Sequence, residues 1–223
     1  RGLSYRVNES HILSLKRSRN EDKYQKGEVL NIELRDYLQR SNKFKSNYKG
    51  YKVAIEFPQK PVEIDPYFFG LWLGDGHSYS SRITNIDSEV IAYLDTYADE
   101  LNLSLVKYEQ FNKTPNYAIT SGQRGVKTGF CIQEELRILN TLGNKHIPDV
   151  YLYNSSANRL KLLAGLIDSD GHYQTQYDCY EITQKNEQLA RQIKYLGDSL
   201  GFRVSLNEKR ASISSIGFES QVY

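Results

Sequence analysis

Two stretches of the chain share an apolar pattern that ends in Asp-Gly, and this pair constrains the fold more than any other feature. Residues 68–76 (FFGLWLGDG) and 163–171 (LAGLIDSDG) align without a gap at a separation of 95 residues. A helix that is apolar all round must be buried, normally against another helix. Gly70 and Gly165 lack a Cβ, so the partner backbone can approach closely there. We therefore expect the two helices to pack together and to bring Asp75 and Asp170 to the same end.

The repeat extends beyond these two helices. Each is followed by a short strand and then by a segment with helical apolar periodicity, residues 88–101 and 189–200. The separation here is 99 residues, so the second copy has a loop four residues longer, near 174–178. The remaining alternating segments, such as 103–106 and 202–206, predict strands, and the fold class is α+β.

Both motifs resemble the LAGLIDADG homing endonuclease family in its single-chain, two-motif form. The resemblance implies a pseudo-twofold pair of αββαββ-type subdomains with saddle-shaped antiparallel sheets, acting as a monomeric pseudo-dimer. We assign residues 61–223 to this domain, with halves 61–152 and 153–223, and we expect the second half to be truncated.

The first 60 residues form a different, β-rich segment. Residues 28–34 and 53–57 alternate as strands do, and the basic stretch 35–50 is turn-like. Asn8-Glu9-Ser10-His11 resembles the second splicing motif of inteins, in which such a pair polarises the upstream splice junction. Asn8-x-x-His11 taken alone is a very weak signal, because such a histidine is more often an ordinary residue at the surface or at the edge of a core.

The two ends depart from the intein pattern. Arg1 is not a nucleophile, the chain closes on Tyr223 rather than a cyclising Asn, and no Met is present. We therefore expect a piece of an intein splicing domain, partnered by the remaining intein segments if these are made separately.

Composition narrows the protein classes further. Cys131 and Cys179 are too few and too scattered for a disulfide framework or a zinc site. There is no apolar run of about 20 residues that could span a membrane and no signal-peptide pattern. An intracellular location, in cytoplasm or nucleus, is expected.

The net charge of +2 hides an asymmetry. Residues 1–60 hold 14 Lys and Arg against 7 Asp and Glu, whereas the remainder holds 15 against 20. A basic segment beside an acidic-centred domain is typical of a protein that binds phosphates in one place and a metal ion in another. It is equally typical of a solvated surface.

The paired acids suggest a metal site. Mg²⁺ takes only one or two protein carboxylates and keeps its waters. Two carboxylates a few ångströms apart repel each other, and a bound cation removes that repulsion. We predict that Asp75 and Asp170 hold Mg²⁺ (or Mn²⁺) and that each acts on one DNA strand. The alternative is that both are ordinary residues at helix C-termini.

Two further residues are candidate catalytic groups. Asp87 occupies a position that resembles a supporting acid of intein endonucleases, although it also suits a helix N-cap. Lys145, in a Lys-x-Ile-Pro element similar to one found between the two motifs of intein endonucleases, would stabilise phosphate charge or orient water. No second lysine of this kind is evident.

Double-stranded DNA is the expected partner, lying on the outward strand faces. Side chains there that can contact bases or phosphates are Tyr79, Arg82, Thr84, Lys107, Lys113, Arg124, Lys127, Gln174, Gln176, Gln184, Lys209 and Arg210.

Three functions fit these patterns. The first is an intein-encoded, Mg²⁺-dependent endonuclease that makes double-strand breaks at a long DNA site. The second is a protein-splicing element with a secondary or decayed nuclease. The third is a maturase or DNA-binding regulator on the same fold, which loss of either Asp75 or Asp170 would favour.

Overall fold

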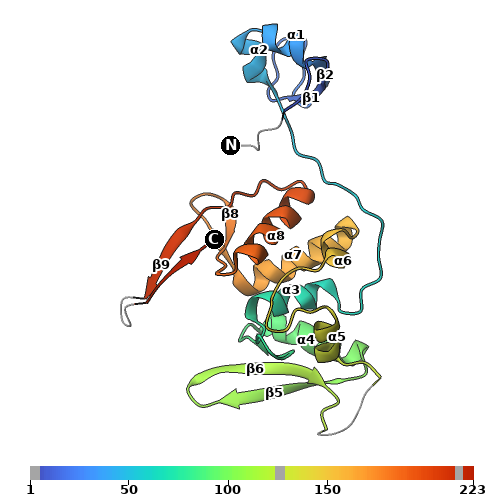
Figure 1. The fold of residues 1–223 in the computed structure, drawn as a ribbon, viewed down its shortest axis with the longest axis vertical. Coiled ribbons are helices and arrows are strands. Elements are labelled where there is room, and N and C mark those ends of the chain that lie inside the picture. The colour runs from blue at the N-terminus through green and yellow to red at the C-terminus, as the bar shows by residue number, and fades with distance from the viewer. Residues whose placement is uncertain (1–5, 124–128, 214–217) are drawn as a thin grey trace. The chain divides into compact units, whose positions relative to one another are not determined.

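The chain has two compact units, residues Arg1–Val53 and Ala54–Tyr223 (Figure 1). The structure is a computed structural model and describes residues 6–123, 129–213 and 218–223. Residues 54–60, predicted to belong to the N-terminal segment, instead pack within the second unit. There the Asn154 side chain bonds both backbone groups of Lys60, and the Ile55 N–H donates to Ser199 O at 2.8 Å.

The N-terminal unit is a three-stranded antiparallel sheet with two short helices. Strands β1 (Ile12–Arg17), β2 (Val29–Glu33) and β3 (Tyr48–Lys49) lie in the order β2-β1-β3, and Leu15, Ile32 and Tyr48 form its core. Helices α1 (Leu34–Gln39) and α2 (Asn42–Asn47) occupy the stretch predicted to be turn-like, so that prediction was wrong. Ser41 caps α2, and the Phe44 ring on this helix stacks on Tyr48, which favours helix over turn.

Residues 53–57 were predicted to form a strand, but they run as an extended segment outside any sheet. Instead of pairing in a sheet, side chains of this segment form a hydrogen bond and a ring contact with residues of the second unit. Glu56 accepts the backbone N–H of Ser156, and the Phe57 ring packs edge-on against Tyr153. Alternation alone could not distinguish this segment from a paired strand.

The second unit is built around helices α3 (Pro66–Asp75) and α7 (Ser156–Asp170), which pack on each other (Figure 1). Asp65 caps α3 by accepting the N–H groups of Tyr67 and Phe68, and Pro66 takes the first helical position. Ser155 caps α7 in the same way. Phe68, Leu71 and Trp72 of α3 and Leu162 and Leu166 of α7 are fully buried, as the apolar pattern predicts.

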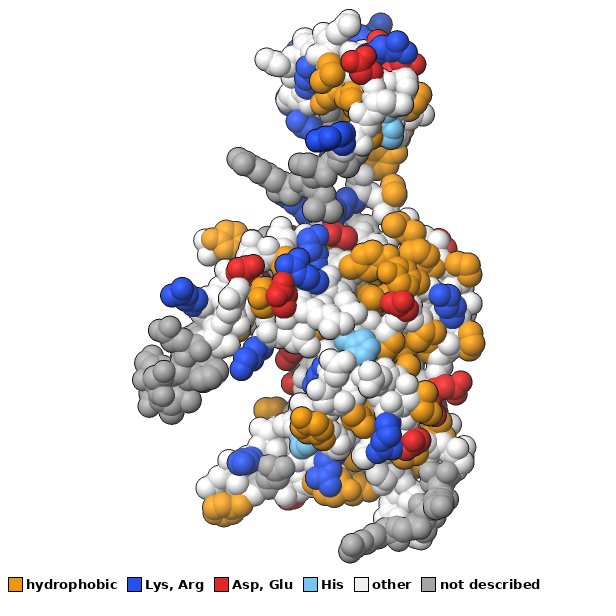
Figure 2. All heavy atoms as spheres, viewed as in Figure 1, with side chains coloured by type: hydrophobic (Ala, Val, Ile, Leu, Met, Phe, Trp, Pro, Cys, Tyr) orange, Lys and Arg blue, Asp and Glu red, His pale blue; other side chains and the backbone are white. Residues whose placement is uncertain are grey.

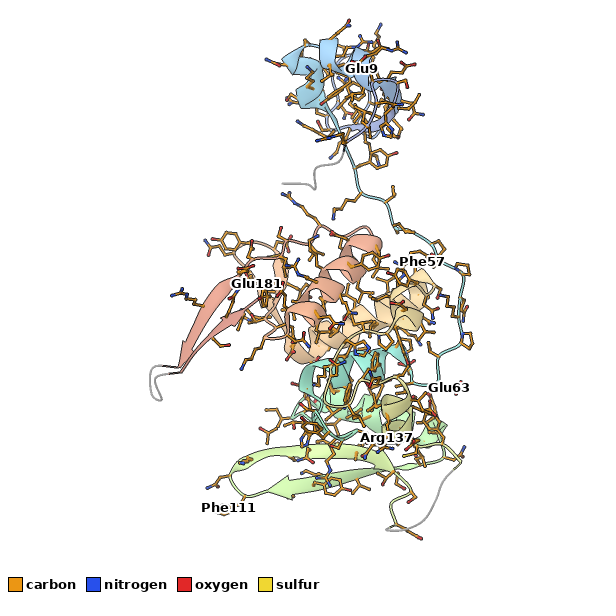
Figure 3. All side chains as sticks on the ribbon, viewed as in Figure 1. Glu9, Phe57, Glu63, Phe111, Arg137 and Glu181 are labelled. Atoms are coloured by element: carbon orange, nitrogen blue, oxygen red, sulfur yellow. The ribbon has the colours of Figure 1, made fainter. Side chains whose placement is uncertain are left out.

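The first half continues with β4 (Ile83–Thr84), α4 (Ser88–Glu100), β5 (Ser104–Gln110) and β6 (Lys113–Thr120). The strands form an antiparallel sheet in the order β4-β6-β5. The β5–β6 hairpin is long, and Phe111 is exposed at its tip (Figure 3). Helices α5 (Ile132–Ile138) and α6 (Asp149–Leu152) complete this half and bury Ile132, Leu136 and Tyr151.

The second half repeats the early part of this order. It comprises β7 (Gly171–Gln174), β8 (Cys179–Ile182), α8 (Glu187–Ser199), β9 (Lys209–Ile213) and β10 (Phe218–Val222). Helices α4 and α8 are each followed by a residue with positive φ, Asn102 and Gly201, 99 residues apart. Residues 202–206 form no strand, contrary to the prediction, and the next strand begins at Lys209.

The mixture of helices with small antiparallel sheets agrees with the predicted α+β class. Within the described residues, no helix is long and apolar enough to cross a membrane.

Candidate active site

Reciprocal glycine contacts hold α3 and α7 together. A Cβ placed on Gly70 would lie 2.9 Å from Leu166 N and 3.0 Å from Gly165 Cα, and would also strike Leu162 O. A Cβ on Gly165 would lie 2.9 Å from Leu71 N and 3.1 Å from Gly70 Cα, and would strike Tyr67 O. The contacted atoms are themselves 95 residues apart in each case. The two backbones therefore touch at equivalent points, and a side chain at either glycine would separate the helices.

This packing brings Asp75 and Asp170, the last residues of α3 and α7, into one site. A Cβ on Gly74 would lie 3.2 Å from Asp170 Cγ, so the Asp170 carboxyl group lies against the end of α3. Both carboxyl groups are partly buried. Burial, reinforced by the charge of Asp170, raises the pKa of Asp75 to about 6. Burial also raises the pKa of Asp170 above its ordinary value. Burial is therefore the main cause of both shifts, and repulsion from Asp170 adds to the shift of Asp75.

Each carboxylate accepts a hydrogen bond from an amide side chain. Asn85 Nδ2 donates to Asp75 Oδ2 at 2.9 Å, and Gln184 Nε2 donates to Asp170 Oδ2 at 2.5 Å. Both bonds lower the pKa of the acid they reach. Asn85 and Gln184 are 99 residues apart, so they are equivalent in the repeat. The sequence prediction did not include Asn85, and it assigned Gln184 to DNA contact alone. The 99-residue offset, applied to the positions after each motif, would have identified the two amides as equivalent.

Lys145 supplies a partly buried cation beside the two acids. Its Nζ donates to the carbonyl oxygens of Leu73, Gly74 and Gly76 at 3.0, 3.1 and 2.7 Å. A cation is favoured at the C-terminus of a helix, and it also lies 5.2 Å from the centroid of the Trp72 ring. Burial lowers the pKa of Lys145 to about 8 against the opposing effect of the two acids. The prediction placed it near phosphate, and the structure places its ammonium group at the end of α3.

The backbone around Lys145 is fixed by the second half of the repeat. Asn186 Nδ2 donates to Lys145 O at 2.9 Å. The Gln192 side chain bonds both the N–H and the carbonyl of Ile147, at 2.8 and 2.9 Å. The connecting segment is therefore held by α8 while its lysine reaches α3, which links the two halves at the site.

The other residues near the acids have local partners. Asp87 caps α4 by accepting the N–H of Glu89 at 2.8 Å, the alternative role that its position allowed. His77 Nε2 lies 3.1 Å from Thr84 Oγ1, and burial together with Arg82 lowers its pKa. Asp168 accepts a hydrogen bond from the Tyr67 hydroxyl at 2.7 Å and does not join the carboxylate pair. The catalytic role of Asp87 stays a prediction.

The predicted DNA-contacting residues fall on strands and turns of both halves, and several have partners already. The Arg82 guanidinium stacks on the Tyr108 ring at 3.9 Å, and Tyr79 is 80% exposed. Lys107 pairs with Glu109 at 2.6 Å, and Lys209 lies 3.6 Å from Glu181. Lys113 begins β6, Gln174 ends β7, Gln176 lies in the turn after it, and Arg210 lies opposite Gln221. Arg124 and Lys127 lie outside the described residues.

Basic side chains are visible beside both the β5–β6 and the β9–β10 hairpins in Figure 2. Asn116 of β6 is a polar residue that the sequence prediction did not single out. Its side chain is 0% exposed, and neither amide atom has a hydrogen-bond partner among the described residues. Strand register places Asn116 between Thr84 and Tyr108.

Asn8 and His11 lie in the N-terminal unit, in the segment that immediately precedes β1. The His11 N–H donates to Asn8 O at 3.2 Å, so the two residues close a turn, and both side chains are exposed. On its visible face, this unit mixes Lys and Arg with acidic and hydrophobic side chains (Figure 2).

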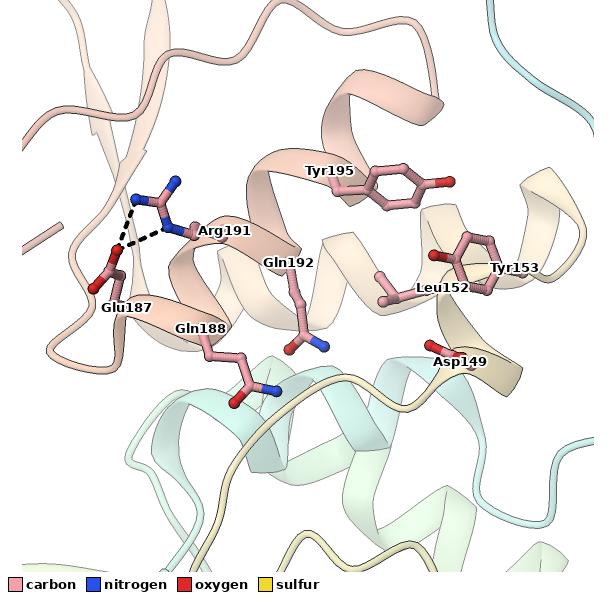
Figure 4. A pocket seen from close by; sticks show the side chains of 8 residues that line it. All are labelled: Asp149, Leu152, Tyr153, Glu187, Gln188, Arg191, Gln192 and Tyr195. Carbon is pink, nitrogen blue, oxygen red and sulfur yellow. Dashed lines mark hydrogen bonds and ion pairs between the residues drawn. The ribbon is translucent and has the colours of Figure 1, made fainter.

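A separate surface hollow of about 540 Å³ lies on α6 and α8 (Figure 4). It is lined by the Glu187–Arg191 ion pair and by Asp149, Tyr153 and Tyr195, among others. Its lining includes neither Asp75, Asp170 nor Lys145, so it is not part of the carboxylate site.

The donor set of the site is entirely oxygen-based. No cluster of three or more His, Cys, Asp or Glu side chains occurs in the part of the chain that the structure describes. Each carboxylate accepts an amide hydrogen bond on one of its oxygens, so its other oxygen is left as a donor. Such oxygen donors suit a hard divalent cation whose other ligands are waters.

Comparison with known proteins gives two similarities. Residues 146–223 match the sequence profile of a family described as homing endonuclease. Over 157 residues, or 70% of the chain, the sequence is 33% identical to the replicative DNA helicase DnaB of Mycobacterium intracellulare. The aligned region accounts for 22% of that helicase's length. The endonuclease match contains Asp170 and Gln184, and it supports a nuclease activity for this part of the chain.

Proposed function

We propose that residues 54–223 form a site-specific DNA endonuclease of the LAGLIDADG type, encoded within an intein. The observation that carries the proposal is the duplicated site itself. Two helices touch at equivalent glycines, end in equivalent aspartates, and receive hydrogen bonds from equivalent amides. Such a pseudo-twofold arrangement suits a substrate with its own twofold relation, namely the two strands of duplex DNA.

Asp75 and Asp170 are the residues that would hold the divalent metal, Mg²⁺ in this proposal. Their raised pKa values support it, because the single charge of Lys145 does not fully compensate two partly buried carboxylates. A bound Mg²⁺ supplies an activated water and charge stabilisation for the phosphate and the leaving oxygen. Asn85 and Gln184 orient the carboxylates by fixing one oxygen of each.

Lys145 provides the fixed positive charge at the proposed site. Its Nζ is anchored by three carbonyl oxygens, so it is held in place before substrate arrives. A preorganised cation stabilises the negative charge that develops on a phosphodiester in the transition state. This role extends the sequence prediction for Lys145 without requiring a second lysine.

DNA binding is assigned to the outward strand faces of both halves. Arg82, stacked on Tyr108, is the candidate base contact of the first half. Arginine suits guanine in the major groove. Polar and basic contacts are added by Lys113 on the β5–β6 hairpin, Gln174 and Gln176 on the β7–β8 hairpin, and Arg210 on the β9–β10 hairpin.

The test is cleavage of a large randomised DNA duplex library in Mg²⁺, with Ca²⁺ and Asp75→Asn as controls. The proposal expects one long, nearly unique cut site that both controls abolish, while Asp75→Asn and Asp170→Asn still bind it. Full cleavage by either variant would overturn the shared metal site. Binding without any cleavage would favour a DNA-binding regulator.

A second candidate is a protein-splicing element whose nuclease is secondary. The Asn8-x-x-His11 turn and the similarity to a helicase more than four times the aligned length favour an inserted element. The discriminating experiment inserts the chain, joined to flanking intein ends, into a reporter protein. Ligated reporter that disappears on His11→Ala would support splicing, and equal yields would assign His11 to the surface.

A further inference from the structure

The strand pairs that follow α3 and α7 start with the same residues in the same register. Gly76 lies opposite Ile83, and Gly171 lies opposite Ile182. Each glycine is followed by a histidine, and each isoleucine is followed by a threonine. The offsets of 95 and 99 residues relate the two pairs, so each of these positions has an equivalent in the other half.

One position in this shared pattern differs in charge. The His77 N–H donates to Arg82 O at 2.8 Å, and His172 lies opposite Glu181. Arg82 and Glu181 therefore occupy equivalent positions, each opposite a histidine and before an isoleucine. A guanidinium group has only hydrogen-bond donors, whereas a carboxylate has only acceptors. The second half thus offers acceptors at the point where the first half offers donors.

Both of these side chains lie on the outward side of their strands. Ile83 is 1% exposed and belongs to the core, and neighbouring residues of a strand face opposite sides. Arg82 therefore faces outward, where it stacks on Tyr108. Glu181 precedes Ile182, which packs against the core, and its side chain is 44% exposed on β8 (Figure 3). The carboxylate is thus on the side that the proposed function assigns to DNA.

Lys209 of β9 brings a donor next to this acceptor. Its Nζ lies 3.6 Å from Glu181 Oε2, and its side chain is 61% exposed. An exposed ion pair of this kind contributes little to stability, so the fold does not depend on it. The pair presents an acceptor and a donor side by side. In the major groove, a C·G base pair presents the complementary order, with the N4 amino donor of cytosine beside the O6 acceptor of guanine.

We propose that Glu181 and Lys209 together recognise one C·G base pair in the major groove. This assignment rests on the proposed endonuclease function and names part of its DNA site. Glu181 accepts a hydrogen bond from cytosine N4, and Lys209 donates to O6 or N7 of the paired guanine. Phosphate groups repel a carboxylate, so the base edge is the favourable contact for Glu181. Adenine also carries an amino group, but its N7 acceptor lies beside that group and repels the carboxylate.

The contact makes the DNA site asymmetric at one pair of positions. In the proposed twofold relation, Arg82 and Glu181 contact opposite strands at equal distances from the centre of the site. A palindromic site would need the same base for both residues. Arg82 suits guanine, whereas Glu181 selects cytosine. One strand therefore carries guanine at both positions, because the cytosine that Glu181 contacts is paired with guanine.

The experiment selects duplexes from a randomised library with the whole chain. Selection by binding in Ca²⁺ measures base preference without cleavage, and selection by cutting in Mg²⁺ measures the nuclease. The wild type is compared with Glu181→Gln, Glu181→Arg and Arg82→Gln, and the last of these marks the equivalent position in the first half-site. The matched control is Glu134→Gln, because Glu134 is also exposed and paired with a basic side chain but lies on α5.

We expect the wild type to select guanine and cytosine at these two positions. Glu181→Gln should lower the preference for cytosine by about 10-fold and favour adenine, which an amide side chain suits, and Glu181→Arg should favour guanine. Glu134→Gln should select the wild-type sequence. If the wild type, Glu181→Gln and Glu181→Arg all select the same base at this position, the proposal is overturned.

The base contact and the nuclease fail in different ways. A wild type that cuts DNA, with variants at Glu181 that keep its base preference, overturns the base contact and leaves the nuclease intact. A wild type that selects the C·G pair in Ca²⁺ but does not cut in Mg²⁺ overturns the nuclease and supports the base contact. Selection of no sequence under either condition overturns both.

Discussion

Replacing Asp75 by asparagine tests whether the carboxylate pair is held under unfavourable charge. The pKa of Asp75 is raised from 3.8 to about 6 by burial and by Asp170. Because the folded-state pKa lies above the unfolded one, this group stabilises the fold fully only below about pH 4, and that stabilisation is lost as the pH rises through about 6. The shift is equivalent to at most about 3 kcal/mol. Solvent screening of a partly exposed group reduces this to about 1 to 2 kcal/mol.

We therefore expect Asp75→Asn to increase the free energy of unfolding by about 1 to 2 kcal/mol near neutral pH in the presence of a chelator. For a chain of this size, the melting temperature should rise by about 2 to 8 °C. The asparagine keeps an oxygen that can accept the hydrogen bond from Asn85. Calorimetry between about pH 4 and pH 8 should show the two proteins converging at the acidic end, where the wild-type carboxyl group is protonated.

Adding Mg²⁺ extends the same experiment. A ligand that binds the folded state raises its stability, so Mg²⁺ should raise the melting temperature of the wild type and leave Asp75→Asn nearly unchanged. Asp95→Asn, an exposed carboxylate on α4, is the matched control. If Asp75→Asn is no more stable than the wild type near neutral pH, the charge argument is refuted. Equal stabilisation of both proteins by Mg²⁺ would place the metal elsewhere.

Three further predictions concern the rest of the site. Gly70→Ala should lower the free energy of unfolding by about 1 to 3 kcal/mol, because its methyl group meets α7 backbone, whereas Gly50→Ala, with open space around it, should change the denaturation midpoint very little. The cleavage rate should rise through about pH 6 as Asp75 ionises and fall through about pH 8 as Lys145 loses its proton, giving a bell-shaped profile in single-turnover assays. Asn85→Ala and Gln184→Ala should each slow cleavage by about 10-fold. Each should also raise the pKa of the acid that the amide contacts, which shifts the acidic limb of the pH profile to higher pH. An unshifted limb would contradict the positioning role of the two amides.

The helix pair could be predicted from the sequence because its signals are local and repeated. Gly70 and Gly165 indicate close helix packing, and Asp65-Pro66 indicates a helix start. The duplication of the motif then indicates that the two helices pack on each other, which the structure shows. Residues 53–57 and 202–206 show the opposite case. Their alternation is that of a strand, but strand formation also needs a partner backbone, and no local pattern says whether that partner is present.

The side-chain partners of the site were harder to predict than its acids. Asn85 and Gln184 differ in type and follow loops of different length, so they align only after the offset changes from 95 to 99. Lys145 was predicted as a site residue from its surrounding motif, and that role stays a prediction. Its three carbonyl partners could not be predicted, since they depend on how the connecting segment returns to the end of α3. Contacts between distant segments of this kind are fixed by the fold rather than by sequence neighbours.

The geometry also explains why a duplicated site need not be a symmetric one. The helices, aspartates and amides come in equivalent pairs, whereas the partly buried Lys145 comes from the segment that joins the halves. The Lys145 ammonium group donates to carbonyl groups at the end of α3, and its backbone is held by Asn186 and Gln192 of the second half. Asp75 therefore ends the helix whose carbonyl groups bind this cation, and Asp170 ends the other helix, although the charge of Lys145 lowers the pKa of both acids. In the proposed nuclease, a chain that joins two copies through such a segment would give the two acids different environments, and so different rates on the two strands of one asymmetric DNA site.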